Sequence, residues 1–254
     1  MCKVKDIYSF LDRLAPFSTQ CAWDNAGLLV GDANASVQKI GLCLDITSPM
    51  IEQAAALGIS LMVSHHPVIF TSIQQVHTAS PVHALIRHGI TAICAHTNLD
   101  LASGGVNDTL ARQLGLLDIC PLADTADALP LGRVGRLAQP LSPRALAQKV
   151  KSDLTCGGVR FVEGRSPIEK VAVCGGAGAD LLGAAAAAGA DALITGEAKH
   201  HELLLAQQLG LTLIDGGHFC TEHGVLYPLK EKLTAAFSAC EVYILQEAEP
   251  ASYL

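Results

Sequence analysis

The stretch that decides the fold runs from residue 40 to residue 66 and reads IGLCLDITSPMIEQAAALGISLMVSHH. It contains an apolar run, then a segment with helix-forming residues that ends at Gly58, then a second apolar run that ends at His65 and His66. Alternating strands and helices are typical of an α/β protein with a sheet of parallel strands. We therefore predict a strand–helix–strand unit here, followed directly by a polar site.

The same pattern returns at residues 171–197, which align with residues 40–66 without a gap. Residues 89–93 then match residues 210–214. With one inserted residue, the pattern His96-x-x-x-Asp100 falls on His218-x-x-x-Glu222. We interpret this self-similarity as a duplication, with a first α/β repeat at residues 1–125 and a second at residues 126–254. The two repeats are expected to pack face to face with the functional site between them.

Spacing and capping signals extend this prediction along the chain. Apolar residues at helical spacing predict a helix over residues 6–14. Ser48 is expected to cap a helix that ends at Gly58, and Asn107 a helix that ends near Gly115. Short apolar runs predict strands at residues 28–30, 39–44, 59–63 and 90–95. The polar stretch 118–130 is predicted to be an irregular connection between the halves.

Composition limits the class of function. The chain has 254 residues, 50% of them hydrophobic, and a formal net charge of −7. An acidic chain has no general attraction to nucleic-acid phosphates, which argues against a nucleic-acid partner without excluding one. The nine cysteines include no C-x-x-C pair and suit reduced, buried thiols. Because we find no signal-peptide core and no apolar run long enough to cross a bilayer, we expect a cytoplasmic protein without a membrane partner.

Four short segments carry histidine beside another potential metal ligand. Three of them directly follow an apolar run that is predicted to be a strand. Imidazole and carboxylate groups are ligands for Zn, Mn, Fe and similar ions. The segments are Ser64-His65-His66-Pro67, His96-Thr97-Asn98-Leu99-Asp100, Lys199-His200-His201 and His218-Phe219-Cys220-Thr221-Glu222.

The spacing within these segments predicts how they act. Adjacent residues of a regular strand point to opposite faces, so His65 and His66 suit two ions, or one ion and an orienting role. His218 and Glu222 lie four residues apart and share a face if a helix starts after Gly217. A carboxylate can bridge two cations through its two oxygens. We therefore expect a site of two divalent ions whose excess positive charge is balanced by an anion such as hydroxide or phosphate.

Other candidates are weaker. His96 is ambiguous and suits either an orienting partner of a ligand or a group that transfers protons. His200 and His201 are expected at an exposed or interface helix face, at the rim of the site. A Ser-His-Asp triad is not supported, because no G-x-S-x-G motif is present. The Gly175-Gly176-Ala177-Gly178 turn lacks the spacings of a nucleotide-binding loop.

Together these segments resemble the YbgI-like dinuclear-metal proteins, which are commonly labelled "GTP cyclohydrolase 1 type 2 homologue". The resemblance runs nearly end to end and rests on the histidine segments above together with Trp23-Asp24-Asn25-x-Gly27-Leu28, Gly104-Gly105-Val106-Asn107-Asp108 and Thr195-Gly196-Glu197-x-Lys199-x-His201. It implies two intertwined α/β repeats, with mixed, largely parallel sheets, that assemble as a hexameric ring. It also implies that His66 and Asp100 hold one ion, His65 and His218 hold the other, and Glu222 bridges them.

The function expected from this resemblance is that of a metal-dependent hydrolase acting on a nucleotide or another phosphate-containing substrate, with GTP cyclohydrolase-type chemistry among the possibilities. Glu222 and His96 are the predicted catalytic residues; an uncoordinated His96 or His201 would move protons. The ions are two divalent metals, Fe, Mn, Zn, Co or Ni, per subunit. Two alternatives stay open at this stage: a non-catalytic metal-binding scaffold or metal-handling protein, and a ring that encloses nucleic acid.

Overall fold

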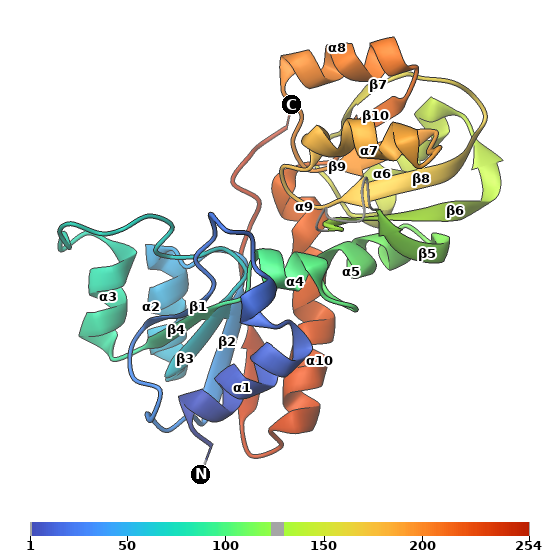
Figure 1. Cartoon of the computed structure of the whole chain (residues 1–254). Helices are drawn as coiled ribbons and strands as arrows, with labels where there is room; N and C mark the ends of the chain where they lie inside the picture. Colours follow the sequence, from blue (N-terminus) through green and yellow to red (C-terminus); the bar gives the residue numbers. More distant parts are fainter. Residues whose placement is uncertain (1, 123–129, 254) are drawn as a thin grey trace. The chain divides into compact units, whose positions relative to one another are not determined.

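A computed structural model describes residues 2–122 and 130–253 of the chain (Figure 1). Its elements form two compact units. Unit 1 comprises residues 1–103 and 226–248, and unit 2 comprises residues 104–225 and 249–254. The chain therefore passes from one unit to the other three times. This division does not follow the boundary at residues 125 and 126 that the repeat suggests, because α10 (Leu226–Ala236) and β11 (Glu241–Ile244) return to unit 1.

Unit 1 is built on a five-stranded sheet with the order β1-β4-β3-β2-β11. The strands β2 (Lys39–Cys43), β3 (Leu61–Ser64) and β4 (Thr91–Cys94) run parallel, and β11 adds to β2 in parallel as well. Only β1 (Gly27–Val30) pairs antiparallel among the described strands of this sheet. Parallel strands buried on both faces need continuous apolar runs, and this is why β2, β3 and β4 lack the alternation of an exposed sheet.

Helices cover both faces of this sheet (Figure 1). α2 (Ser48–Leu57) and α3 (Pro81–His88) contribute Ile51, Ala54 and Leu85 to a core that includes Met62 of β3. α1 (Val4–Leu14) and α10 cover the opposite face, and α1 buries Ile7 and Leu11. A short helix, α4 (Thr97–Leu101), follows β4, and the single turn η1 (Phe17–Thr19) follows α1.

Unit 2 is built on a six-stranded sheet with the order β5-β6-β8-β9-β10-β7. Its centre is parallel, formed by β8 (Ile168–Cys174), β9 (Ala192–Thr195) and β10 (Thr212–Asp215). The outer pairings are antiparallel: β5 (Leu117–Leu122) with β6 (Gly132–Leu141), β6 with β8, and β10 with β7 (Arg160–Val162). Both units are thus mixed α/β layers with parallel central strands, which confirms the predicted fold class.

The faces of the second sheet carry different cores. α5 (Val106–Gln113) and α6 (Pro143–Asp153) pack Leu110 and Leu146 against Val171 and Ile194. On the other face, α7 (Leu182–Ala187) and α8 (His200–Leu209) pack Leu182 and other residues against the strands. The remaining elements of this unit are η2 (Ala179–Leu181), α9 (His218–Glu222) and η3 (His223–Val225).

The strand registers agree with the predicted duplication. Ile40 of β2 pairs with Leu61 of β3, and Val171 of β8 pairs with Ala192 of β9, the positions that the gap-free alignment equates. Gly58 directly follows α2 and Gly189 lies two residues after the end of α7, and each has a φ of 69°. Glycine at this position accepts the left-handed conformation that closes a helix. These observations support a duplication, which stays an interpretation of the sequence.

Three local predictions were wrong. Thr47, not Ser48, occupies the cap position of α2, so that Ser48 is the first helical residue. α5 starts after Gly105, and Asn107 lies inside its first turn, where its side chain contacts Leu131 O and the Gly175 N–H instead of capping the helix. Part of the stretch 118–130 is strand, because β5 extends to Leu122; residues 123–129 lie outside the described residues.

A buried ion pair in unit 2 gives a first prediction. The Asp108 carboxylate accepts from the Arg133 guanidinium, and these side chains are 11% and 5% exposed. Burial alone would raise the pKa of Asp108, but hydrogen bonds from the Gly104 N–H and from Arg133 outweigh it and lower the pKa below its ordinary value. Replacing Asp108 with Asn leaves a buried positive charge uncompensated. The free energy of unfolding at pH 7 should therefore fall by about 3 kcal/mol.

The effect should depend on pH in a defined direction. Because the pKa of Asp108 is lowered on folding, its contribution is complete above the unfolded pKa of about 3.9 and disappears as the pH falls through the folded pKa. Urea unfolding of wild type and Asp108→Asn should therefore differ at pH 7 and converge below about pH 4. Arg112→Ala is the control, because the Arg112 side chain is 61% exposed in its pair with Asp108. A constant difference across this range would contradict the assignment.

Candidate metal centre

Unit 1 places three histidines at the ends of β3 and β4. Their ring centroids lie 4.9 Å apart for His65 and His66, 5.2 Å for His65 and His96, and 5.6 Å for His66 and His96. Each ring has a nitrogen within 4.8 Å of a nitrogen of the other two. The sequence argument expected His65 and His66 on opposite faces of a regular strand. The strand ends at Ser64, however, and the Ser64 hydroxyl donates to His66 O over 2.8 Å, where the two rings turn toward each other.

Each of these rings is held through its Nδ1 atom. His65 Nδ1 lies 3.0 Å from Ala95 O, His66 Nδ1 lies 2.9 Å from Asp45 Oδ1, and His96 Nδ1 lies 2.8 Å from Asp24 Oδ1. A carbonyl or carboxylate oxygen can only accept, so Nδ1 is the donor in all three bonds. The electron pair of each ring is then on Nε2. This is the arrangement by which proteins orient histidines that bind metals.

Asp100 brings a carboxylate to this group. It lies on α4, and its Oδ1 atom is 3.6 Å from Nε2 of the buried His65. The resemblance implied that Asp100 shares an ion with His66, whereas this contact joins it to His65. Unit 1 therefore combines three imidazoles and one carboxylate, a nitrogen and oxygen donor set that suits Zn, Fe, Mn, Co or Ni.

Asp24 orients the ring of His96, the histidine whose role was ambiguous from the sequence. Besides His96 Nδ1, its carboxylate accepts from the Thr97 N–H and the Thr97 hydroxyl. Burial alone would raise the pKa of Asp24, but the hydrogen bonds from His96 and Thr97 lower it well below its ordinary value. An ionised carboxylate is thus bound directly behind the His96 ring. His96 is therefore available as a ligand in its own right, and not only as an orienting or proton-transferring group.

Unit 2 carries a second set of donors on α9. Gly217, with a φ of 87°, leads into the helix, so that His218 and Glu222 occupy one face as predicted. His218 Nε2 lies 3.1 Å from Glu222 Oε2, and His218 Nδ1 lies 2.7 Å from Glu197 Oε1. Both nitrogens of this ring therefore face carboxylates. This arrangement favours a cation between His218 Nε2 and Glu222, either a proton or a metal ion.

The glycine turn after β8 supports this helix and does not resemble a nucleotide loop. The Gly176 N–H donates to the Thr221 hydroxyl over 3.1 Å, and Gly176 O accepts from the Gly196 N–H over 2.8 Å. A Cβ atom on Gly176 would clash with Glu222 Oε1 and lie 3.2 Å from His218 Nε2. Glycine is therefore required for the backbone to approach these donor atoms so closely.

This close approach gives a second prediction. Gly176→Ala should weaken metal binding at least about tenfold, because the added methyl group displaces Glu222 and His218 without removing a donor atom. Gly189→Ala is a matched control: its φ of 69° resembles the 62° of Gly176, but nothing lies within 4 Å of the added Cβ. Both variants should lose some stability, since alanine is strained at positive φ. Competition titration with a chelator should show weaker binding only for Gly176→Ala; equal affinities would contradict the prediction.

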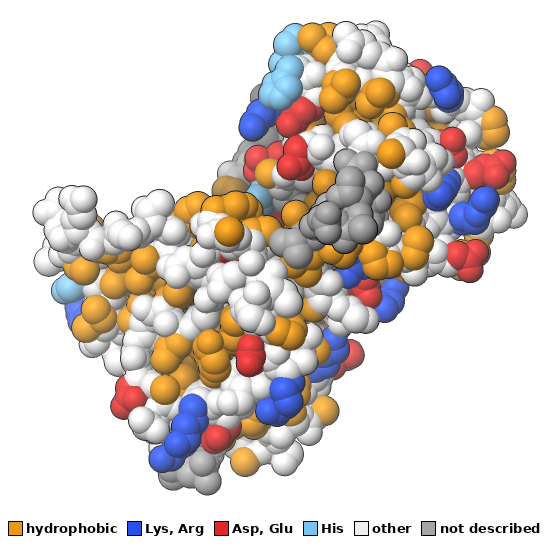
Figure 2. Space-filling view, viewed as in Figure 1, with side chains coloured by type: hydrophobic (Ala, Val, Ile, Leu, Met, Phe, Trp, Pro, Cys, Tyr) orange, Lys and Arg blue, Asp and Glu red, His pale blue; other side chains and the backbone are white. Residues whose placement is uncertain are grey.

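The remaining histidine segment does not join these groups. His200 and His201 begin α8, where both are exposed, and Figure 2 shows histidine side chains at the surface over this helix. His201 Nε2 lies 3.8 Å from Glu202 Oε1, and its side chain is 75% exposed. These observations fit the predicted exposed helix face.

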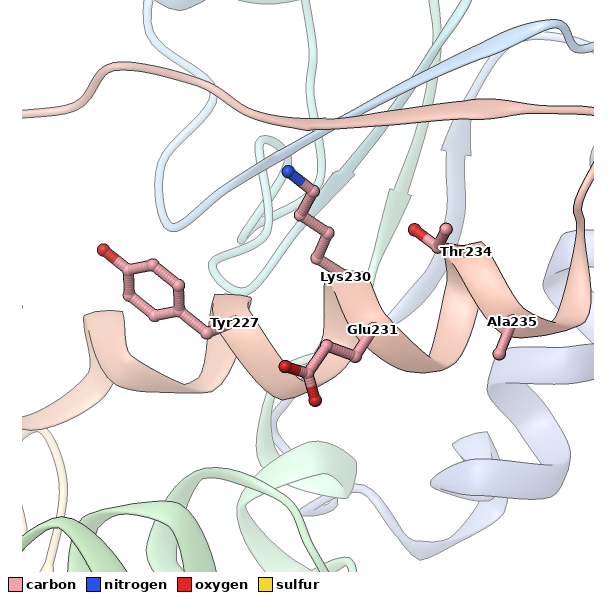
Figure 3. A pocket seen from close by; sticks show the side chains of 5 residues that line it. All are labelled: Tyr227, Lys230, Glu231, Thr234 and Ala235. Atoms are coloured by element: carbon pink, nitrogen blue, oxygen red, sulfur yellow. The ribbon is translucent and has the colours of Figure 1, made fainter.

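A surface cavity of about 550 Å³ lies elsewhere on unit 1. Figure 3 shows its lining side chains along α10, and none of them is a candidate ligand; they are Tyr227, Lys230, Glu231, Thr234 and Ala235. Within the described residues 2–122 and 130–253, no helix is both long and apolar enough to cross a membrane.

Sequence reasoning missed the residues that orient the rings. Asp24, Asp45 and Glu197 each hold one histidine through Nδ1. Asp24 and Glu197 belong to motifs that were recognised, but only as a turn and as part of a resemblance. The signal that could have identified them is an acidic residue beside a glycine turn or a strand end, in a chain that already carries paired histidines.

Comparison with known families identifies the chain. The family model Duf34/NIF3 (NGG1p interacting factor 3) matches residues 2–250. The chain belongs to the Duf34/NIF3 family. This membership agrees with the resemblance to YbgI-like proteins, and a solved structure of protein ybgI is similar with a TM-score of 0.88 and 24% identity, over 98% of this chain and 100% of that chain.

Several known proteins resemble most or all of the chain. A "GTP cyclohydrolase 1 type 2 homolog" of Clostridium perfringens is 33% identical over 97% of both chains. A protein of Helicobacter pylori named "GTP cyclohydrolase 1 type 2" is 32% identical over 88% of both chains. Among solved structures, the Staphylococcus aureus hypothetical protein SA1388 matches with a TM-score of 0.91 and 29% identity over 99% of both chains.

Proposed function

We propose that this NIF3-family protein binds two divalent metal ions and hydrolyses a nucleotide or another phosphate-containing substrate. The observation that carries the proposal is the orientation of four imidazoles. His65, His66, His96 and His218 each direct Nδ1 to an oxygen acceptor, and each then offers Nε2. Metal-binding histidines usually donate their other ring N–H to such an acceptor, so the shared orientation supports a metal site.

Each unit, taken by itself, contributes part of the donor groups that the proposed metal site needs. Unit 1 offers His65 beside Asp100, with His66 and His96; unit 2 offers His218 beside Glu222. Neither set alone supplies donors for two ions. We therefore propose, as the family resemblance implies, that the two sets together bind two ions, with His65, His66, Asp100 and His218 as ligands and Glu222 as the bridging group. This proposal rests on donor chemistry and on the matched motifs.

The residues of the chain have distinct proposed roles. When bound, two divalent ions would supply an activated water nucleophile and stabilise the negative charge that develops on the substrate. Asp24, Asp45 and Glu197 keep the imidazoles in one tautomer and one orientation. His96 is the group proposed to hold or transfer a proton at Nε2 when it is not a ligand, because Asp24 holds its ring in place through Nδ1.

A substrate screen tests this proposal. Purified protein is loaded with Zn, Mn, Fe, Co or Ni in turn and incubated with nucleoside triphosphates, nucleoside monophosphates and simple phosphate esters. We expect metal-dependent release of phosphate, or an opened base, with at least one pair of metal and substrate. Metal binding without turnover in any combination would contradict the hydrolase and favour the alternative of a metal-binding scaffold.

The homohexameric ring implied by the resemblance is also proposed for this chain. Its support is the similarity to the family over the whole length. Sedimentation equilibrium should give about six times the mass of the 26.5 kDa chain if the ring forms. A monomer or dimer at micromolar concentration would contradict it.

A further inference from the structure

Two aromatic side chains of unit 1 stand exposed beside the histidine group. Trp23 is 60% exposed and Phe70 is 52% exposed. Their ring centroids lie 5.9 Å apart with an interplanar angle of 39°. Both rings meet His96 edge to face: its centroid is 6.0 Å from that of Trp23 and 6.4 Å from that of Phe70. The candidate metal ligand His96 thus lies against an apolar, aromatic wall.

The backbone beside both aromatic residues is held by hydrogen bonds, one of which also orients His96. Asp24, the residue after Trp23, accepts from His96 Nδ1 over 2.8 Å. Asn25 Nδ2 donates to Ile69 O over 2.6 Å and so ties the Trp23 turn to the segment that carries Phe70. These bonds fix the backbone on both sides of the wall. A preorganised surface of this kind loses little entropy when a ligand binds to it.

Exposure of the Trp23 and Phe70 side chains to water costs free energy unless a ligand or another surface covers them. Large aromatic side chains bury most of their surface in proteins, and Ile73 and Val76 of the same segment are also 44% and 49% exposed. A planar ring ligand cannot enter between Trp23 and Phe70, since a sandwich needs about 7 Å between the outer rings, twice the ordinary contact distance. It can stack on the outer face of either ring and extend toward His96.

We propose that Trp23 and Phe70 bind the planar heterocyclic ring of the substrate, beside the histidines whose proposed metal ions would hold its phosphate. The inference rests on the proposed function and narrows its substrate class to phosphates that carry a conjugated ring, such as nucleotides. Stacking on aromatic side chains accepts any flat ring, so the two residues should favour nucleotides over sugar phosphates without choosing strongly between bases.

The chain provides its own probe, because Trp23 is its single tryptophan. The tryptophan fluorescence of the metal-loaded protein is recorded during titration with GMP or AMP, and with ribose 5-phosphate, a ligand without a heterocyclic ring. We expect saturable quenching by both nucleotides and about tenfold weaker binding of ribose 5-phosphate, measured by competition. Equal affinities for GMP and ribose 5-phosphate would overturn the proposal.

Two variants separate ring binding from other roles of the surface. Phe70→Leu keeps an apolar side chain and the Trp23 probe; it should weaken GMP binding several-fold and leave ribose 5-phosphate unchanged. Trp23→Leu removes the fluorescent probe, so its affinity for GMP is measured by calorimetry. This affinity should be about tenfold weaker than that of wild type, at unchanged metal content. If either variant instead changes the oligomeric state and leaves GMP affinity unaltered, the wall is an interface between copies of this chain and the proposal is wrong.

The outcomes also separate this inference from the proposed function. A protein that binds no metal and hydrolyses nothing refutes the proposed function in the wild type, before any variant is made. A protein that hydrolyses phosphate esters with and without a ring equally well, at equal KM, retains the proposed function and refutes ring binding by Trp23 and Phe70.

Discussion

Glu222→Gln is expected to lower the hydrolytic turnover about a thousandfold, the equivalent of about 4 kcal/mol in the activation barrier. Glu222 lies on α9, where its Oε2 atom is 3.1 Å from His218 Nε2. The substitution keeps the shape of the side chain but removes its negative charge and one of its two donor oxygens. Turnover is measured with the best substrate of the screen, at saturating metal concentration.

The control for this variant is Glu249→Gln. Glu249 also belongs to unit 2 and accepts from the Tyr253 hydroxyl over 2.8 Å, in contact with Cys220 instead of His218. The same chemical change there should leave turnover within about twofold of wild type, since Glu249 is half-buried and the contacts above involve no proposed metal ligand. If Glu222→Gln retains wild-type turnover while it remains folded, Glu222 is not part of the catalytic centre.

Asp24→Ala is expected to weaken metal binding in unit 1 by about ten- to a hundredfold, although Asp24 is not itself a proposed ligand. Its carboxylate accepts from His96 Nδ1 and from the Thr97 N–H and hydroxyl. Without it, the His96 ring loses the bond that fixes its tautomer, and the N–H of Thr97 is left without its acceptor. Metal affinity is measured by competition with a chelator of known strength.

Asp32→Ala is the matched control for this change. Asp32 lies in the same unit and accepts from the Asn34 N–H over 2.8 Å in an exposed turn. Its loss should leave metal affinity unaltered. The same affinity for wild type and Asp24→Ala would show that His96, oriented by Asp24, does not contribute to metal binding.

The elements that carry the histidines could be predicted from the sequence, since they depend on local patterns. Apolar runs as short as β3 and β4 are unambiguous when a glycine-terminated helix precedes each of them. The pairing of His218 with Glu222 also follows from local geometry, because residues four apart share a helix face. These predictions needed no knowledge of distant contacts.

The groups that orient the rings could not be predicted in this way. Asp24 and His96 are separated by 72 residues, and His66 and Asp45 by 21. Which oxygen faces which Nδ1 depends on how β1 and β4 are placed side by side, and hydrophobic periodicity contains no information on this. For the same reason the prediction for Asn107 was wrong. Its position in the sequence resembles a helix cap, but its side chain contacts Gly175, which is distant in the sequence.

The division of the chain into units was also beyond local patterns. A duplication predicts two similar halves, and the registers of β2–β3 and β8–β9 agree with it. It does not predict that β11 returns to pair with β2, since this pairing joins residues 241–244 to residues 39–42. Long-range strand pairing of this kind is set by the packing of whole layers, which a short alignment does not contain.

Metal content is the measurement that tests the proposed centre most directly. The protein is incubated with Zn, Mn, Fe, Co or Ni in turn, separated from unbound metal, and analysed by plasma mass spectrometry beside His66→Ala and His218→Ala. We predict about two ions per chain for wild type with at least one metal, and about one or fewer for each variant. Wild-type protein that retains no metal under any of these conditions would contradict the proposal.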